Sequence, residues 1–295
     1  MATLGPPSLF TACVATTVFC VMLAIGLDIA PAELRRAWHA PGPVLRGLFV
    51  VLIAVPALAL VIVRALDLPR PVQAGILLMA ISPGAPVALR RSLAATGRSA
   101  FAPGLQICVA LLAGFSIPLS IAALDEIYGA DVTVAPSQIM RQVLAAQLVP
   151  LALGTGCRGL LPGLALRLEP WAARTGTLLL VATLVLAFVQ LEEATLRAGI
   201  RGLAACAAIT VAALTAGHWL GGPEPHTRSA VAILGAARNS GLALLVATLN
   251  AAQSRVVATI LAYLVVSLLF IVPYAAWRGR GLSASRVGPR SNCST

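Results

Sequence analysis

The chain has 295 residues, of which 59% are hydrophobic and 11% are charged, and its mean hydropathy is +0.93. Soluble globular domains carry about 25% charged residues, so this composition excludes an ordinary soluble protein and predicts a membrane protein. The formal net charge is +11, but no soluble domain is available to present it to nucleic acid, so we interpret it as information on membrane topology.

Nine apolar segments are long enough to cross ~30 Å of hydrocarbon as helices. They cover residues 8–29, 43–65, 72–95, 100–122, 136–162, 170–191, 198–220, 227–250 and 254–277. The sequence therefore predicts an all-α polytopic membrane protein with about nine transmembrane helices. We expect a single transmembrane domain over residues 1–278 and a disordered cytoplasmic tail over residues 279–295.

The arginines predict the orientation of these spans. An odd number of spans puts the two termini on opposite sides, and a cytoplasmic C-terminus gives fourteen arginines inside and six outside. Basic residues gather on the cytoplasmic side of membrane proteins. We therefore expect a multi-pass protein of the cell (inner) membrane, with its N-terminus outside and its C-terminus in the cytoplasm.

The sequence shows no pattern typical of an enzyme or a metal site. The three histidines, His39, His218 and His226, lie near span ends without metal-ligand spacing. The six cysteines are scattered, mostly within apolar runs, and form no CxxC pair. No segment between spans is long enough for a catalytic domain. We expect a protein that is not an enzyme and has no cofactor and no metal site.

An internal repeat relates the third and eighth spans. The sequence Leu-x-x-Pro-x-Pro at 66–71 recurs at 220–225, and each copy begins an apolar half-helix. Each half-helix then reaches a break at a matching distance, at Pro83-Gly84 and at Arg238-Asn239-Ser240. Interrupted helices in two inverted halves mark the binding site of secondary transporters. We expect inverted repeats at about 8–122 and 136–277; chance recurrence of a Pro-rich loop is the alternative.

The first break offers the chemistry of an anion site. A break in a membrane helix leaves backbone N–H groups without partners, and the N-terminus of the following half-helix carries a positive partial charge. Ser82 supplies a hydroxyl, Pro83 interrupts the helix, and Gly84 permits an unusual backbone conformation. A proline kink with no ligand is the alternative interpretation.

The second break places a charge in the middle of a span. A buried arginine costs at least ~2.5 kcal/mol on membrane-insertion scales, so Arg238 is a candidate functional residue. We expect it, with Asn239 and Ser240, to meet an anionic substrate or to replace a mobile cation. The alternative is that Arg238 extends to a membrane surface. Gln106, early in the fourth span, either lines the same cavity or bonds to a neighbouring helix.

Three short motifs follow one another along the chain: Gly26-Leu27-Asp28 with Leu34-Arg35-Arg36, Ser82-Pro83-Gly84-Ala85 with Ala95-Thr96-Gly97, and Arg238-Asn239-Ser240-Gly241-Leu242-Ala243. Their order resembles the GxGL…DFRR, CPGG and QNSGLA motifs of the bile acid:sodium symporter family, over most of residues 10–275. The resemblance implies two broken helices that cross at the membrane centre, and core and panel domains that move during alternating access. Typical members have ten spans, and this chain resembles the members that lack the first.

The residues that the resemblance places at the family's sodium sites are mostly poor sodium ligands. They are Ala88, Leu89, Ala102, Gln106, Leu234 and Arg238, and only Asn239 is retained. A guanidinium group would also repel a sodium ion. We therefore expect the site residues Ser82, Pro83, Gly84, Gln106, Arg238, Asn239 and Ser240 to bind a small organic anion, with sodium a doubtful cofactor.

The sequence as a whole predicts a secondary transporter of a small organic anion that works by alternating access with lost or altered sodium coupling. Its expected partners are this substrate and the lipid bilayer, with no nucleic acid. Two alternatives stay open. One is another inverted-repeat carrier of the auxin-efflux type, and the other is a membrane scaffold or sensor that does not transport.

Overall fold

The computed structural model describes residues 9–28, 41–84, 101–128, 136–190, 199–250 and 252–286, and every regular element in these ranges is a helix. The elements in order are α1 (Leu9–Asp28), α3 (Pro41–Phe49), η1 (Val50–Ala54), α4 (Val55–Ala65), α5 (Arg70–Ile81), α7 (Phe101–Tyr128), α8 (Pro136–Val143), η2 (Leu144–Leu148), α9 (Val149–Leu160), α10 (Pro162–Gln190), α12 (Gly199–Leu220), α13 (Pro225–Ala236), α14 (Ser240–Leu249) and α15 (Ser254–Arg286).

The helices confirm the all-α polytopic fold. Seven helical stretches are long and apolar enough to cross a membrane, with α3–η1–α4, α8–η2–α9 and α13–α14 each forming one of them. The half-helix α5 and the 29-residue helix α10 lie at the other two predicted spans. Helix α10 begins at Pro162, earlier than the predicted 170, because Leu161 alone separates it from α9 and Pro suits the first turn of a helix.

The C-terminal helix is longer than its predicted span. Helix α15 continues to Arg286, into the segment that was predicted to be a disordered tail from 279. No proline follows Pro273 before Pro289, so nothing in the intervening sequence forces the helix to end. The remainder of the predicted tail, residues 287–295, lies outside the described residues, as does His39.

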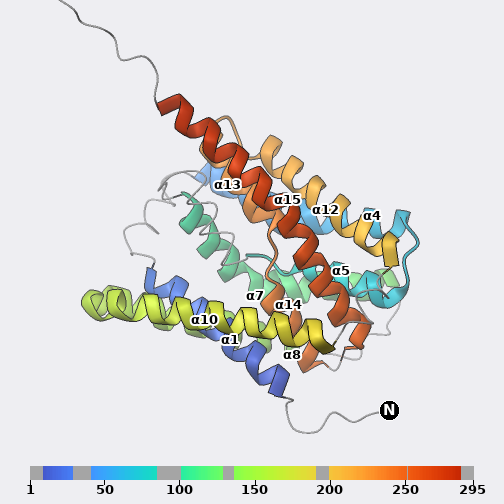
Figure 1. The fold of residues 1–295 in the computed structure, drawn as a ribbon, viewed down its shortest axis with the longest axis horizontal. Coiled ribbons are helices and arrows are strands. Elements are labelled where there is room, and N and C mark those ends of the chain that lie inside the picture. Colours follow the sequence, from blue (N-terminus) through green and yellow to red (C-terminus); the bar gives the residue numbers. More distant parts are fainter. Residues whose placement is uncertain are drawn as a thin grey trace, which may run out of the picture.

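Helices α1, α8–η2–α9 and α10 form a group that we call the three-helix group. Figure 1 shows α1 and α10 lying side by side, and α9 packs against both. Glycine makes the α1–α9 contact so close that backbone meets backbone. A Cβ atom added at Gly154 would lie 2.6 Å from the Leu23 carbonyl oxygen and 2.8 Å from Gly26 Cα. Small residues allow this approach between membrane helices.

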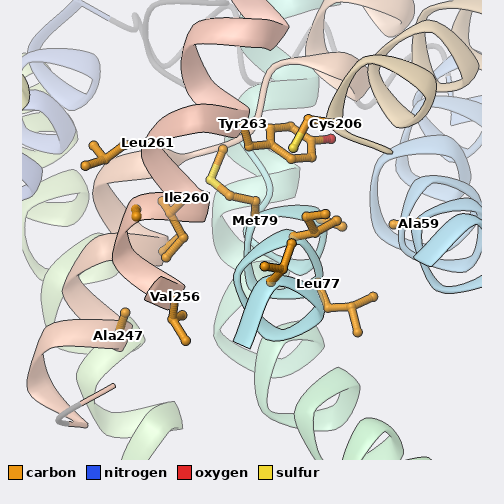
Figure 2. Packing of buried hydrophobic residues seen from close by; sticks show 14 of the residues in the cluster. Ala59, Leu77, Met79, Cys206, Ala247, Val256, Ile260, Leu261 and Tyr263 are labelled. Carbon is orange, nitrogen blue, oxygen red and sulfur yellow. The ribbon is translucent and has the colours of Figure 1, made fainter. Parts of the chain in front are cut away.

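The largest buried hydrophobic cluster joins helices α4, α5, α12, α14 and α15. Figure 2 shows part of it, with Tyr263 and Ile260 of α15 facing Met79 and Leu77 of α5. A second cluster joins α3, η1, α7, α12 and α13. The stretch α13–α14 is enclosed by these clusters, since its most apolar window is entirely buried within the protein. The break between α13 and α14 therefore lies inside the packed helices.

Candidate functional site

The two broken helices contact each other at their breaks. Helices α5 and α13 each run for 12 residues before they stop, at Ile81 and Ala236. The backbone N–H of Asn239 then donates a hydrogen bond of 3.0 Å to the carbonyl oxygen of Ser82. The N–H of one break and the carbonyl of the other, neither of which is paired within a helix, thus satisfy each other.

The first break packs against α7. Ser82, Pro83 and Gly84 are all buried, and the Ser82 hydroxyl donates to the carbonyl of Leu78 at 2.7 Å. Gly84 has φ +80°, a left-handed conformation that favours glycine. A Cβ atom at Gly84 would lie 2.8 Å from Gln106 Nε2, so the amide of Gln106 lies directly against the break.

The second break starts helix α14. Asn239 is its N-cap residue, and the side-chain oxygen Oδ1 accepts a hydrogen bond of 3.1 Å from Leu242 N–H. This bond fixes the orientation of the amide, so that Nδ2 is the group left to donate. Ser240 is buried at the first position of α14. A Cβ atom at Gly241 would lie 3.1 Å from Val18 of α1, so the three-helix group packs close to this helix start.

Arg238 lies between the two half-helices and is 2% exposed. At 1.5 Å per residue, α13 and α14 place it roughly 18 Å and 15 Å from their outer ends. One donor, Nη1, makes a hydrogen bond of 2.9 Å to the carbonyl of Val51. The side chain is thus held inside the protein and does not extend to a membrane surface.

A π-helical turn explains why the Val51 carbonyl can accept this bond. In η1 the N–H of Val55 bonds to the carbonyl of Val50, five residues back. The next bond of this kind would run from residue 56 to Val51. Residue 56 is proline, which has no N–H, so the Val51 carbonyl has no donor of that kind within its own helix. Arg238 supplies the missing donor.

Donors outnumber acceptors among the unsatisfied polar groups at the crossing. Four donors there are buried without a partner: Arg238 Nε, Arg238 Nη2, Asn239 Nδ2 and Gln106 Nε2. Gln106, which is 1% exposed, has both Nε2 and Oε1 unsatisfied, and so forms no hydrogen bond to a neighbouring helix. Buried polar groups are nearly always hydrogen-bonded in proteins, so unsatisfied groups at one place indicate a ligand or water site.

No buried carboxylate balances Arg238 in the described part of the chain. The acidic side chains whose exposure is described are all exposed or half-buried: Asp28, Asp67, Glu126, Glu169 and Glu224. Burying a guanidinium group without a counter-ion is costly. The crossing therefore has one positive charge, an excess of donors and no described anion.

The sequence prediction missed two polar features. It did not predict the contact of Arg238 with Val51, nor the buried Gln147 in η2, whose Oε1 is also without a partner. Both π-helical turns precede a Val-Pro pair within a span, at 55–56 and at 149–150. A proline in mid-span, which removes one N–H donor, was the signal that could have revealed them.

Comparison with protein families matches residues 15–196, more than half of the chain, to the Sodium Bile acid symporter family. The chain belongs to this family. It is therefore a membrane-embedded protein of the organic-anion transporter type. No curated protein sequence matches the chain.

Some positions of this chain correspond, by the resemblance, to the family's sodium ligands. Those that the structure describes hold apolar residues or residues without a negative charge. Ala102 and Leu234 are buried among hydrophobic side chains, and Gln106 offers one neutral oxygen. Ala88 and Leu89 lie outside the described residues. Of the family's QNSGLA sequence, the chain keeps all but the glutamine, which is Arg238, but the amide oxygen of Asn239 caps α14.

Proposed function

We propose that this chain is a secondary transporter of a small organic anion, and that Arg238 binds the anionic group of the substrate. The observation that carries the proposal is that the Arg238 guanidinium is buried with two unsatisfied donors. None of the carboxylates whose exposure is described is buried with it. An anion at this point would satisfy both donors and balance the charge. The protein acts by alternating access and not as an enzyme.

The unsatisfied donors favour a carboxylate in particular. Nη1 of Arg238 is engaged by Val51, which leaves Nε and Nη2. These two N–H groups lie on one side of the planar guanidinium and point in parallel directions. A carboxylate accepts such a pair with its two oxygens, and this is the strongest geometry for binding it. Asn239 Nδ2 and the N-terminus of α14 add further positive potential.

The same charge argues against sodium coupling. Sodium binding needs several oxygen ligands, and a fixed guanidinium close to them repels the ion. We propose that Arg238 takes the place of a bound sodium ion and stays with the protein through the transport cycle. We also propose the orientation that the distribution of arginines favours, with the N-terminus outside and the C-terminus in the cytoplasm of the cell.

We expect uptake without sodium. The first step is to find carboxylates that bind. The unfolding temperature of the purified protein is measured with each member of a panel of mono- and dicarboxylates, because a ligand that binds the folded state raises this temperature. Matched neutral amides serve as controls. The best labelled carboxylate is then taken up by proteoliposomes equally well in sodium and in choline buffer. Uptake that falls to background in choline would contradict the replacement of sodium by Arg238.

A further inference from the structure

A second group of arginines gathers around the loop between α12 and α13, at the outer end of α13 and roughly 18 Å from the crossing at 1.5 Å per residue. Gly222 in this loop has φ +97°, and a Cβ atom there would lie 2.9 Å from Nη1 of Arg46, at the start of the second predicted span. Arg228 donates from Nε to the carbonyl of Gly222. Two guanidinium groups therefore converge on one glycine from different helices.

A third arginine reaches the same helix end from α15. Arg278 donates from Nε to the hydroxyl of Ser229 at 2.8 Å and from Nη2 to the carbonyl of Pro225 at 3.1 Å. Its guanidinium also lies 5.4 Å from the centre of the Trp277 ring. Arg46, Arg228 and Arg278 thus surround the first turn of α13, and we call them the arginine cluster.

This arrangement places positive charges where a helix is already positive. The N-terminus of a helix carries about half a positive charge and favours anions. The first turn of α13 has no acidic residue, and the side chain of its N-cap residue Glu224 is exposed and forms no capping bond. One exposed carboxylate against three guanidinium groups leaves a net positive charge of two before the helix end is added.

Two exposed tryptophans near the cluster indicate that it lies at the boundary between membrane and water. Trp219, at the end of α12, and Trp277 of α15 are 79% and 61% exposed, as the largest aromatic side chains are at the boundary between membrane and water. Arg46, which lies beside Gly222 in the loop that follows α12, is also exposed. Positive side chains beside exposed tryptophans at this depth face the phosphate groups of the surrounding lipid.

We propose that the arginine cluster is a binding site for the phosphate of an anionic phospholipid. The lipid's acyl chains lie against the exposed apolar surface, and its phosphate meets Arg46, Arg228 and the N-terminus of α13. Arg278 holds the first turn in place through Ser229 and Pro225. The site is separate from Arg238 and does not depend on the identity of the transported anion.

The test measures the unfolding temperature of the purified chain in detergent while phosphatidylglycerol or phosphatidylcholine is added. The wild-type protein is expected to be stabilised by phosphatidylglycerol at low concentration and much less by phosphatidylcholine. Arg46 is exposed, and Arg46→Gln should raise the half-saturating concentration of phosphatidylglycerol about fivefold. A basic residue near an anionic surface contributes ~1 kcal/mol, which corresponds to this factor. Arg228→Gln should act in the same direction.

Arg201→Gln is the matched control, because Arg201 is also exposed but lies at the opposite end of α12. It should leave the response to phosphatidylglycerol unchanged. Equal stabilisation by the two lipids, or an equal loss in Arg46→Gln and Arg201→Gln, would overturn the proposal. Stabilisation of the same size by inorganic phosphate alone would also overturn it, because the site would then recognise a soluble anion.

Discussion

Replacing Arg238 with Met is expected to weaken binding of the carboxylate severely while the ligand-free protein unfolds at an unchanged or higher temperature. The substitution removes a buried charge with two unsatisfied donors and fills the space with an apolar chain. Exchanging buried ionic groups for hydrophobic ones is often neutral or stabilising by about 1–4 kcal/mol. Losing one partner of a buried charge pair weakens binding by about 2–5 kcal/mol, or ~30-fold to several thousand-fold.

Two further variants separate charge from geometry. Arg238→Lys keeps the positive charge but loses the parallel pair of donors, so we expect binding weaker than in the wild type and stronger than in Arg238→Met. Arg201→Gln removes an exposed charge and should bind as the wild type does. Full uptake by Arg238→Met would refute the role of Arg238 as the anion-binding residue. Unfolding of Arg238→Met without ligand would mean that its bond to Val51 is its main role.

A pair of glycine substitutions on α9 tests the packing of the three-helix group. In Gly154→Ala the new Cβ would lie 2.6–2.8 Å from backbone atoms of α1, so the two helices must separate. Overpacking of this kind typically costs about 1–3 kcal/mol of stability. Gly156, two residues on, has no atom within 4 Å of an added Cβ, and alanine favours a helix by up to ~1 kcal/mol over glycine.

The two alanine variants should therefore shift the unfolding temperature in opposite directions, down for Gly154→Ala and up for Gly156→Ala. Both are measured on purified protein in the same detergent, so the detergent environment cancels in the comparison. Equal shifts in the two variants would show that α1 and α9 do not meet backbone to backbone at Gly154.

The sequence predicted the spans because membrane helices carry their signal in single stretches of apolar residues. It also predicted the breaks, since proline, glycine and arginine are rare enough in mid-span to be recognised. The prediction that Arg238 lies inside the protein follows from its distance to both span ends. In each of these cases the information lies in residues close to one another in the chain.

The contacts across the crossing could not be predicted in the same way. The bond from Arg238 to Val51 joins residues 187 positions apart and depends on a π-helical turn that only the backbone geometry reveals. The bond from Asn239 to Ser82 depends on how two helices cross. Hydropathy indicates that a segment is apolar, but it does not indicate which neighbouring residue each side chain contacts.

Binding of the substrate's anionic group by Arg238 is tested most directly by a structure of the protein with a bromine-substituted carboxylate chosen from the stability screen. We predict a bromine signal beside the crossing and carboxylate oxygens about 2.7–2.9 Å from Nε and Nη2 of Arg238. A carboxylate bound elsewhere, with these two donors occupied by a protein side chain, would contradict it.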